Sequence, residues 1–251
     1  MVLFYYLPMD STTPIITILA TEATDKIING QGSRIAIREG GPAFYLKRVF
    51  RKEKISFTAP FPPYIEVEIH LTEKGEVGRV ENRPSPIQVN FGKITTPFLV
   101  ISTILDDFGL EGISAYQGKI FLDVQGYVRD GNHFSGKKKW RPPQEFVNSC
   151  FCLKGTSEEM SYLPDIFEEQ KQKLLILTKG ENGCEFFYEG VAYSIAPHSI
   201  VKTPHAIGAG DTLFGYFISQ FLKTKNPLLS IHYAMSQTVK FLSGCKDVLD
   251  K

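Results

Sequence analysis

The chain has no apolar run that approaches the roughly 20 residues needed to cross a bilayer, so we do not expect a membrane-spanning protein. It also has few cysteines, and Cys150, Cys152, Cys184 and Cys245 form no C-x-x-C pair. The first residues, MVLFYYLPMDS, lack a basic leader and contain a proline, so we interpret them as a strand and turn. These absences predict a cytoplasmic protein with reduced thiols.

The chain also lacks an excess of charge of either sign. Its 28 basic and 27 acidic residues leave a formal net charge of +1, whereas nucleic-acid binding needs a concentrated basic face. The one basic run, 137–139, is short, and we interpret it as a solvated loop. The five histidines lack metal-ligand spacing, so no zinc site is expected. We therefore expect neither nucleic acid nor a membrane as a partner.

The residues that are present suit a folded α/β domain. At 251 residues, 43% of them hydrophobic, the chain can bury a sizeable core as one domain over 1–251. Short apolar runs that end in small or polar residues recur, separated by helix-length segments. They predict a doubly wound, mainly parallel sheet with its site at the carboxyl ends of the strands, at 14–20, 96–103, 119–128, 149–155 and 173–180.

Residues 64–90 follow a different pattern. YIEVEIHL alternates apolar and polar residues, EKG supplies a turn, and EVGRVENRPSPIQV continues in the same manner. We predict an antiparallel β-hairpin with one wet face, placed to act as a small lid over a site. Exposed edges of such lids can pair, so a homodimer through the lid is possible.

Helices and two further strands account for most of the remainder. GGPAFYLKRVFRKEK has a proline in its first turn and a basic end, which predicts a helix, while GQGSRIAIREGG before it and ISFTAPF after it predict strands. Residues 211–223 have apolar residues at helical spacing. Asn226 is placed to cap a second helix, which starts at Pro227 and runs to Gly244.

The segment Gly208-Ala209-Gly210-Asp211 joins a glycine-rich turn to the first of these helices. Small residues let backbone N–H groups approach an anion, and the positive end of the helix dipole points to the same place. This arrangement predicts a cradle for a phosphate under transfer, where Asp211 removes a proton from an attacking hydroxyl. Alternatively, Asp211 only caps the helix, and the motif by itself leaves both possibilities open.

GAGDTLFGYF resembles the C-terminal signature of the ribokinase-like (PfkB) carbohydrate kinases. Further segments follow in that family's order from residue 15 to about residue 245, namely EGGPAFYL, LDVQGYVRD, TSEE and LTKGENGCEFFY. The resemblance implies a three-layer ribokinase-like fold and an ATP-dependent kinase that phosphorylates a hydroxyl of a small sugar, polyol or nucleoside. LDVQGYVRD is similar to a segment of one branch of the family and favours an inositol-like polyol.

The resemblance also implies roles for single residues. The acceptor would be held by Asp25, Gly40 and Gly41. The residues around the transferred phosphoryl group would be Gly208, Ala209, Gly210 and the general base Asp211. The nucleotide side would be lined by Thr178, Gly180, Gly183 and Glu159, of which Glu159 acts on Mg²⁺ indirectly, through water. For the glycine pair, Thr178 and Glu159, the plainer alternative is an ordinary turn or cap.

Several positions depart from the family's pattern. His205 stands where the family has an Asp that helps to build a monovalent-cation loop, and Ile207 replaces a Thr, which argues against potassium activation. Thr156 replaces an Asn, and no Asn follows the glycine pair. These departures keep a second interpretation open, a catalytically impaired regulatory protein that binds a nucleotide or sugar on the same fold.

Overall fold

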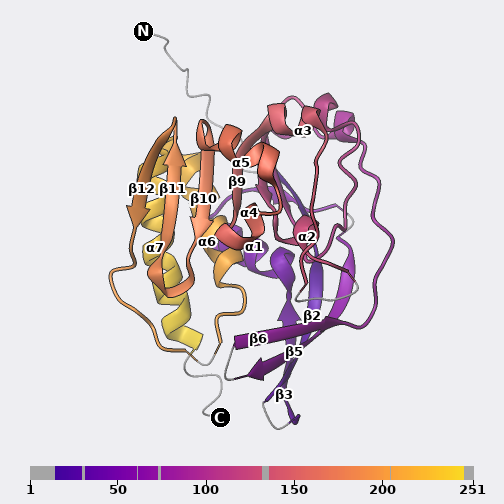
Figure 1. Ribbon diagram of the computed structural model, residues 1–251, viewed down its shortest axis with the longest axis vertical. Helices are drawn as coiled ribbons and strands as arrows, with labels where there is room; N and C mark the ends of the chain where they lie inside the picture. The colour runs from indigo at the N-terminus through magenta and orange to yellow at the C-terminus, as the bar shows by residue number, and fades with distance from the viewer. Residues whose placement is uncertain are drawn as a thin grey trace.

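The computed structural model describes residues 15–29, 32–60, 62–72, 75–131, 136–203 and 205–245. The strand and turn predicted within 1–11 lie outside these residues, as does most of the turn at 73–75. Eight strands form the main sheet in the order β12-β11-β10-β9-β8-β7-β1-β4 (Figure 1). They are β1 (Ile16–Ala20), β4 (Phe57–Thr58), β7 (Phe98–Ser102), β8 (Lys119–Asp123), β9 (Cys150–Thr156), β10 (Leu174–Thr178), β11 (Cys184–Tyr188) and β12 (Val191–Ile195).

The core of this sheet is parallel, as the sequence pattern predicts. β1 pairs in parallel with β4 and β7, and the parallel pairing continues through β8 and β9 to β10. β11 and β12 close one edge as antiparallel strands. Residues 16–20 of β1 are all buried, which is typical of a strand covered on both faces.

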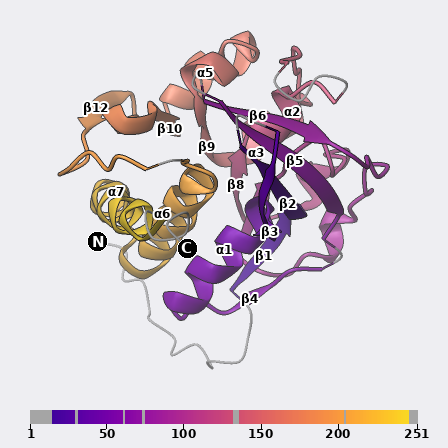
Figure 2. The ribbon, with the colours of Figure 1, turned by 90° about the horizontal axis from the view of Figure 1, so that it is seen from below.

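Helices cover both faces, so the predicted three-layer arrangement is confirmed. α1 (Gly41–Lys52), α6 (Ala209–Thr224) and α7 (Pro227–Gly244) share one hydrophobic core with the sheet, and Figure 2 shows them grouped on one side. The other face packs a second core, which includes residues of α2 (Gln125–Val128), α3 (Gln144–Ser149), α4 (Ser157–Met160) and α5 (Pro164–Lys171). No helix among the described residues is long and apolar enough to cross a membrane.

The predicted hairpin is present but differs in extent, and its role as a lid stays a prediction. β5 (Tyr64–Thr72) and β6 (Gly75–Val80) form the antiparallel hairpin, which belongs to a four-stranded sheet in the order β3-β2-β5-β6. β2 (Glu22–Ile28) and β3 (Arg34–Gly40) complete this lid sheet. Residues 81–90 do not continue the hairpin, because Pro84 and Pro86 cannot donate ladder hydrogen bonds.

Other sequence predictions need smaller corrections. β2 was not predicted, because the charged Asp25 lies among the apolar residues on the buried face of EATDKII and interrupts the alternating pattern. The strand expected in ISFTAPF shrinks to two residues. The strand predicted over 119–128 ends at Asp123, and QGYV forms the short helix α2. Asp123 ends the strand locally, because its Oδ1 accepts a hydrogen bond from the N–H of Gln125 at 3.2 Å.

The predicted cap at the start of α7 can be tested by substitution of Asn226. Asn226 caps this helix, as predicted, with its Oδ1 accepting from the N–H of Leu229 at 3.0 Å. Replacing Asn226 by Ala should lower the free energy of unfolding by about 1 kcal/mol, measured by urea denaturation. Asn226→Ser retains a capping oxygen and should stay within a few tenths of a kcal/mol of the native protein, on the order expected between good caps. An equal loss in both variants would contradict the capping role.

Candidate active site

A pocket of about 280 Å³ lies between the lid sheet, the carboxyl ends of the central strands and the start of α6. It brings together five residues that the sequence predicts for the site, namely Asp25, Gly41, Gly208, Gly210 and Asp211. The lid contributes Val67, Ile69 and Gly78 to its wall. Segments far apart in the chain thus meet at the sheet edge where open α/β folds bind ligands.

The glycine pair at the start of α1, with Gly40 as N-cap and Gly41 as first residue, leaves room for the Asp25 carboxylate. Asp25 is 3% exposed and lies against Gly40, where a Cβ atom would overlap its carboxylate. Gly41 has φ of +76°, and a Cβ atom there would come within 2.7 Å of the carbonyl oxygen of Thr21. Both positions therefore require glycine, and the pair brings the start of α1 against the end of β1.

Asp211 does not cap α6, which excludes the plainer alternative for this residue. The N-cap is Gly208, with φ of +78°, and no described side chain caps the helix. Asp211 is the third helical residue, and it lines the pocket. The N–H of Ala209 donates to the carbonyl oxygen of Ala206 at 3.0 Å, so this amide is engaged within the turn.

Three polar residues that the sequence analysis did not assign to the site lie side by side at the strand ends. The strand register pairs Ser102 of β7 with Asp123 of β8, and Asp123 with Lys154 of β9. Lys154 Nζ and Asp123 Oδ2 are 2.5 Å apart, and the two side chains are 5% and 1% exposed. Ser102 Oγ donates to Asp211 Oδ1 at 3.4 Å. Ser102 and Lys154 thus both lie next to the first turn of α6, Ser102 at Asp211 and Lys154 at Gly210.

Lys154 lies against the glycine-rich turn. A Cβ atom at Gly210 would be 3.1 Å from Lys154 Nζ. Burial by itself would lower the pKa of Lys154, but the charges of Asp123 and Asp211 outweigh it and raise the pKa. The amine therefore stays protonated and supplies a positive charge at the turn. The one sequence signal for it is a charged residue inside the apolar run SCFCLKG, because unpaired lysines are almost never fully buried.

The same surroundings set the protonation of Asp211. Burial raises the pKa of this carboxyl group to about 7, while Lys154 acts to lower it and Asp123 to raise it further. A carboxyl group that titrates near neutral pH can accept a proton from a substrate hydroxyl and release it again. The raised pKa and the position in the pocket wall make Asp211 the leading candidate for a functional residue.

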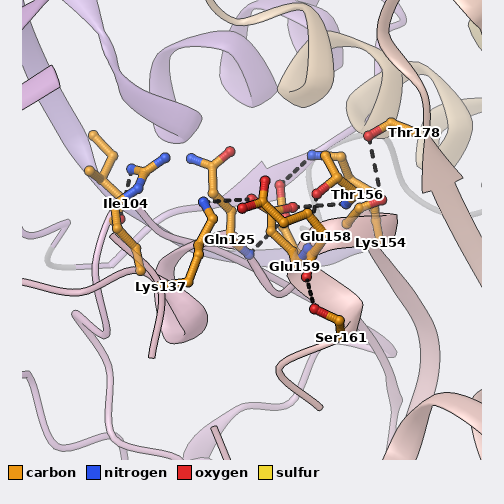
Figure 3. A network of polar contacts seen from close by, with 12 residues as sticks. Ile104, Gln125, Lys137, Lys154, Thr156, Glu158, Glu159, Ser161 and Thr178 are labelled. Carbon is orange, nitrogen blue, oxygen red and sulfur yellow. Dashed lines mark hydrogen bonds and ion pairs between the residues drawn. The ribbon is translucent and has the colours of Figure 1, made fainter. Parts of the chain in front are cut away.

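The segment LDVQGYVRD contributes two more residues to the pocket. Gln125 and Arg129 line it, and Arg129 Nη1 donates to the carbonyl oxygen of Ile104 at 3.0 Å. Figure 3 shows the polar network that extends from Ile104 past Lys137 to Thr178. The resemblance pointed to this segment but did not assign these side chains to the site.

Glu159 is buried and forms a capping box with Thr156 at the start of α4. This is the local role that the plainer alternative, an ordinary helix cap, gives it. Its N–H donates to Thr156 Oγ1 at 3.1 Å, and its Oε2 accepts from the N–H of Thr156 at 2.8 Å. Its other carboxylate oxygen lies 3.7 Å from Lys137 Nζ. Within the described ranges, no cluster of three or more His, Cys, Asp and Glu residues could hold a metal ion.

The predicted nucleotide-side residues lie along the neighbouring strand ends and outside the pocket wall. Thr178 ends β10, and its Oγ1 donates to the carbonyl oxygen of Gly155 at 3.4 Å. Gly180 and Gly183 have positive φ values of +58° and +84° in the turn that follows. A Cβ atom at Gly183 would overlap the carbonyl oxygen of Ile195, which explains the glycine by packing.

Two of the residues that depart from the family's pattern, His205 and Ile207, also lie near the pocket. His205 is 4% exposed, and neither ring nitrogen has a hydrogen-bond partner among the described residues. Burial lowers its pKa, and the charge of Arg38 lowers it further, so the ring is neutral at neutral pH. Ile207 lines the pocket. At the position where the resemblance implies an Asp carboxylate, this chain has the neutral ring of His205 near the guanidinium group of Arg38. That the protein is insensitive to potassium stays a prediction.

No protein-family model matches the sequence, and no curated protein matches it. Solved structures do share its fold. A sulfate complex of a pyrophosphate-dependent kinase in the ribokinase family is 18% identical with a TM-score of 0.69, covering 90% of this chain and 95% of that one. A pyrophosphate-dependent kinase in the ribokinase family, in complex with a pyrophosphate analogue and myo-inositol, is 17% identical with a TM-score of 0.66. The match covers 90% of this chain and 94% of that one. Ribokinase from Thermotoga maritima is 13% identical with a TM-score of 0.65, covering 94% and 96%. The chain therefore has a ribokinase-like fold.

Gly41 allows a test of the glycine pair. Gly41→Ala should lower the free energy of unfolding by about 2–5 kcal/mol, because the left-handed backbone and the clash with Thr21 add together. The matched control is Gly32→Ala, which has a similar φ of +80° and nothing within 4 Å of the added Cβ atom. It should lose only about 1–2 kcal/mol from the backbone conformation. Equal losses in denaturation would show that packing at Gly41 is unimportant.

Proposed function

We propose that this protein is a kinase that transfers the γ-phosphoryl group of ATP to a hydroxyl of a small sugar, an inositol-like polyol or a nucleoside. The observation that carries the proposal is the buried Asp211, with a pKa near 7, between a small-molecule pocket and the glycine-rich turn of α6. The ribokinase-like fold supports it, because similar structures are of kinases.

In this proposal the pocket below the lid holds the acceptor. Asp25 accepts hydrogen bonds from its hydroxyl groups, and the backbone at Gly40 and Gly41 allows close approach. Val67 and Ile69 of the lid give the pocket an apolar cover, which excludes water that would otherwise compete as acceptor. Gln125 and Arg129 add polar groups to the wall of the pocket.

Asp211 acts as the general base. It receives the proton of the attacking hydroxyl while the hydroxyl oxygen forms a bond to the γ-phosphorus and the bond to the leaving ADP oxygen breaks. Lys154 keeps a fraction of Asp211 ionised at neutral pH and places a positive charge against Gly210. Its charge thereby supports both the base and the transferred phosphoryl group.

The donor would lie over the start of α6. We assign its phosphates to the turn of Gly208, Ala209 and Gly210, with the helix dipole and Lys154 as the stabilising charges. The Ala209 amide contributes only if it leaves the carbonyl oxygen of Ala206. Mg²⁺ carried by the donor would neutralise phosphate charge, and Glu159 would act on it through water. The adenosine side extends toward Thr178, Gly180 and Gly183.

A second candidate function rests on the departures from the family's pattern. His205, Ile207 and Thr156 motivate a regulatory protein that binds a nucleotide or sugar without efficient transfer. Calorimetry that detects binding, together with no phosphoryl transfer across a broad panel of acceptors, would favour this candidate. In either case we propose a cytoplasmic protein that could dimerise through the edges of its lid sheet.

The central test is a donor-consumption screen over pentoses, hexoses, inositols and nucleosides. ATP and pyrophosphate should both be offered as donors, because a similar structure is of a pyrophosphate-dependent kinase. Asp211→Asn should lower turnover on the order of 10²–10⁴-fold and leave donor binding largely intact, because only the proton acceptor is removed. Glu168→Gln, which removes an exposed carboxylate from α5, should keep native turnover. Near-native turnover by Asp211→Asn would rule out the base.

The pKa of Asp211 predicts a pH dependence of the reaction. The base must be ionised, so kcat/KM should rise about tenfold per pH unit below the pKa near 7 and level off above it. Lys154→Met should move this acid limb to higher pH, because the charge that lowers the pKa of Asp211 is lost. Lys119→Met, a lysine at the opposite end of β8, should leave the limb in place. A rate that does not change through pH 7 would contradict the assignment.

A further inference from the structure

A second, larger cavity lies next to the acceptor pocket. It is a groove of about 530 Å³ whose wall is formed by β3, α1, the first turns of α6 and the end of α7. Tyr45 and Ile207 belong to the walls of both cavities. The two spaces are therefore neighbours, although nothing described so far assigns a ligand to the groove.

The groove is strongly basic. Four cationic side chains line it against one acidic one, Glu39, and the four are Arg38, Arg48, Lys52 and Lys240. Over the described residues, none of the four forms an ion pair with a carboxylate. Lys52 donates to the hydroxyl of Tyr216 at 2.9 Å, a neutral partner. This cluster contrasts with the near-balanced charge of the whole chain.

Arg38 is the most telling member of the cluster. Its Nε and Nη2 atoms are shielded from solvent, and within the described part of the chain neither has a hydrogen-bond partner. A buried donor without a partner is costly, and a guanidinium group more so, unless a ligand satisfies it. Asp25 is the register partner of Arg38 across the lid sheet, but its carboxylate packs against Gly40. Arg38 therefore has two donors without a hydrogen-bond partner among the described residues, on a side chain that lines the groove.

Two further side chains beside Arg38 are uncharged. His205, whose pKa is lowered by burial and by Arg38 itself, is neutral and can only donate or accept a hydrogen bond. Tyr45 is 4% exposed, and burial raises the pKa of its hydroxyl, so it too is neutral. The groove thus combines a fixed guanidinium group with exposed cations at its rim, the composition that recognises a planar or tetrahedral anion.

Tyr45 connects this groove to the catalytic turn. Its ring packs so closely on Gly208 that a Cβ atom there would overlap the ring carbons. Thr212, on the first turn of α6, also lines the groove. A ligand in the groove would therefore contact the same helix start that positions Asp211.

We infer that the groove binds an anionic group, a phosphate or carboxylate, with Arg38 as its principal contact and Arg48 and Lys240 at its rim. This anion is either part of an acceptor that extends past Tyr45 or a separate small molecule. The first source rests on the proposed kinase function, whereas binding of the anion itself does not.

Binding is tested first, without turnover. Inorganic phosphate is titrated calorimetrically into the full chain, with the turn of α6 saturated by a non-hydrolysable ATP analogue and Mg²⁺. Arg38→Met should weaken phosphate binding at least about tenfold, because a charge-assisted pair of hydrogen bonds is lost. Arg34→Met removes an equal charge from the same strand at an exposed position outside the groove and should leave binding unchanged. Arg48→Met provides a surface substitution should Arg38→Met fail to fold, and it should weaken binding by a smaller factor.

The source of the anion is tested with paired acceptors, such as a hexose and its phosphate or an inositol and its monophosphate. If the anion belongs to the acceptor, the charged member of a pair has the lower KM and Arg38→Met removes the difference. If it is a separate molecule, phosphate changes turnover without competing with the acceptor, and Arg38→Met removes that effect. Phosphate binding that Arg38→Met leaves intact, or that Arg34→Met weakens equally, overturns the inference. Phosphate binding lost in Arg38→Met without any turnover supports the groove and contradicts the kinase function.

Discussion

The buried ion pair between Lys154 and Asp123 is the constraint on which the site depends. With 5% and 1% of the side chains exposed, each charge has lost most of its hydration, which is tolerated only because the partner is 2.5 Å away. Removal of one member of such a pair typically costs about 3–5 kcal/mol, since the other charge is left buried. The pair also holds a positive charge against Gly210 and modulates the pKa of Asp211. A substitution of Lys154 or Asp123 therefore changes both the stability of the fold and the pKa of Asp211.

The position of Asp211 follows from the packing of α6. The helix starts at the left-handed Gly208 and lies over the sheet through Phe214 and Phe217, which are completely buried. Because these residues fix the helix on the sheet, the first turn is held over the ends of β8 and β9. A carboxylate on that turn is then desolvated by the same apolar contacts that hold the helix, and burial raises its pKa.

The lid sheet gives the site its other wall and its second cavity. Because β2 pairs in parallel with β5, Asp25 and the apolar residues Val67 and Ile69 face the same space. Arg38 on β3 extends the same sheet toward the basic groove. Tyr45, packed on Gly208, separates the two cavities. One side chain, Tyr45, therefore contacts the pocket beside the lid sheet, the basic groove and the glycine-rich turn that precedes α6.

Local signals in the sequence determined the parallel strands, the hairpin within 64–90, and the start and end of α7, because each depends on neighbouring residues alone. The glycines at 40, 41 and 208 are explained by contacts with Asp25, Thr21 and Tyr45, which the fold brings close. The glycine-rich motif before α6 indicated Asp211, and the family resemblance indicated Asp25. Only the tertiary structure decided that Asp211 is not a cap, and that Ser102, 109 residues away, donates to it. Only the tertiary structure also decided that Lys154 pairs with Asp123, because that contact depends on the strand register. It likewise decided that two nitrogen atoms of Arg38 have no hydrogen-bond partner among the described residues, because that depends on the side chains around them. Burial and register arise between distant segments, so no local pattern encodes them.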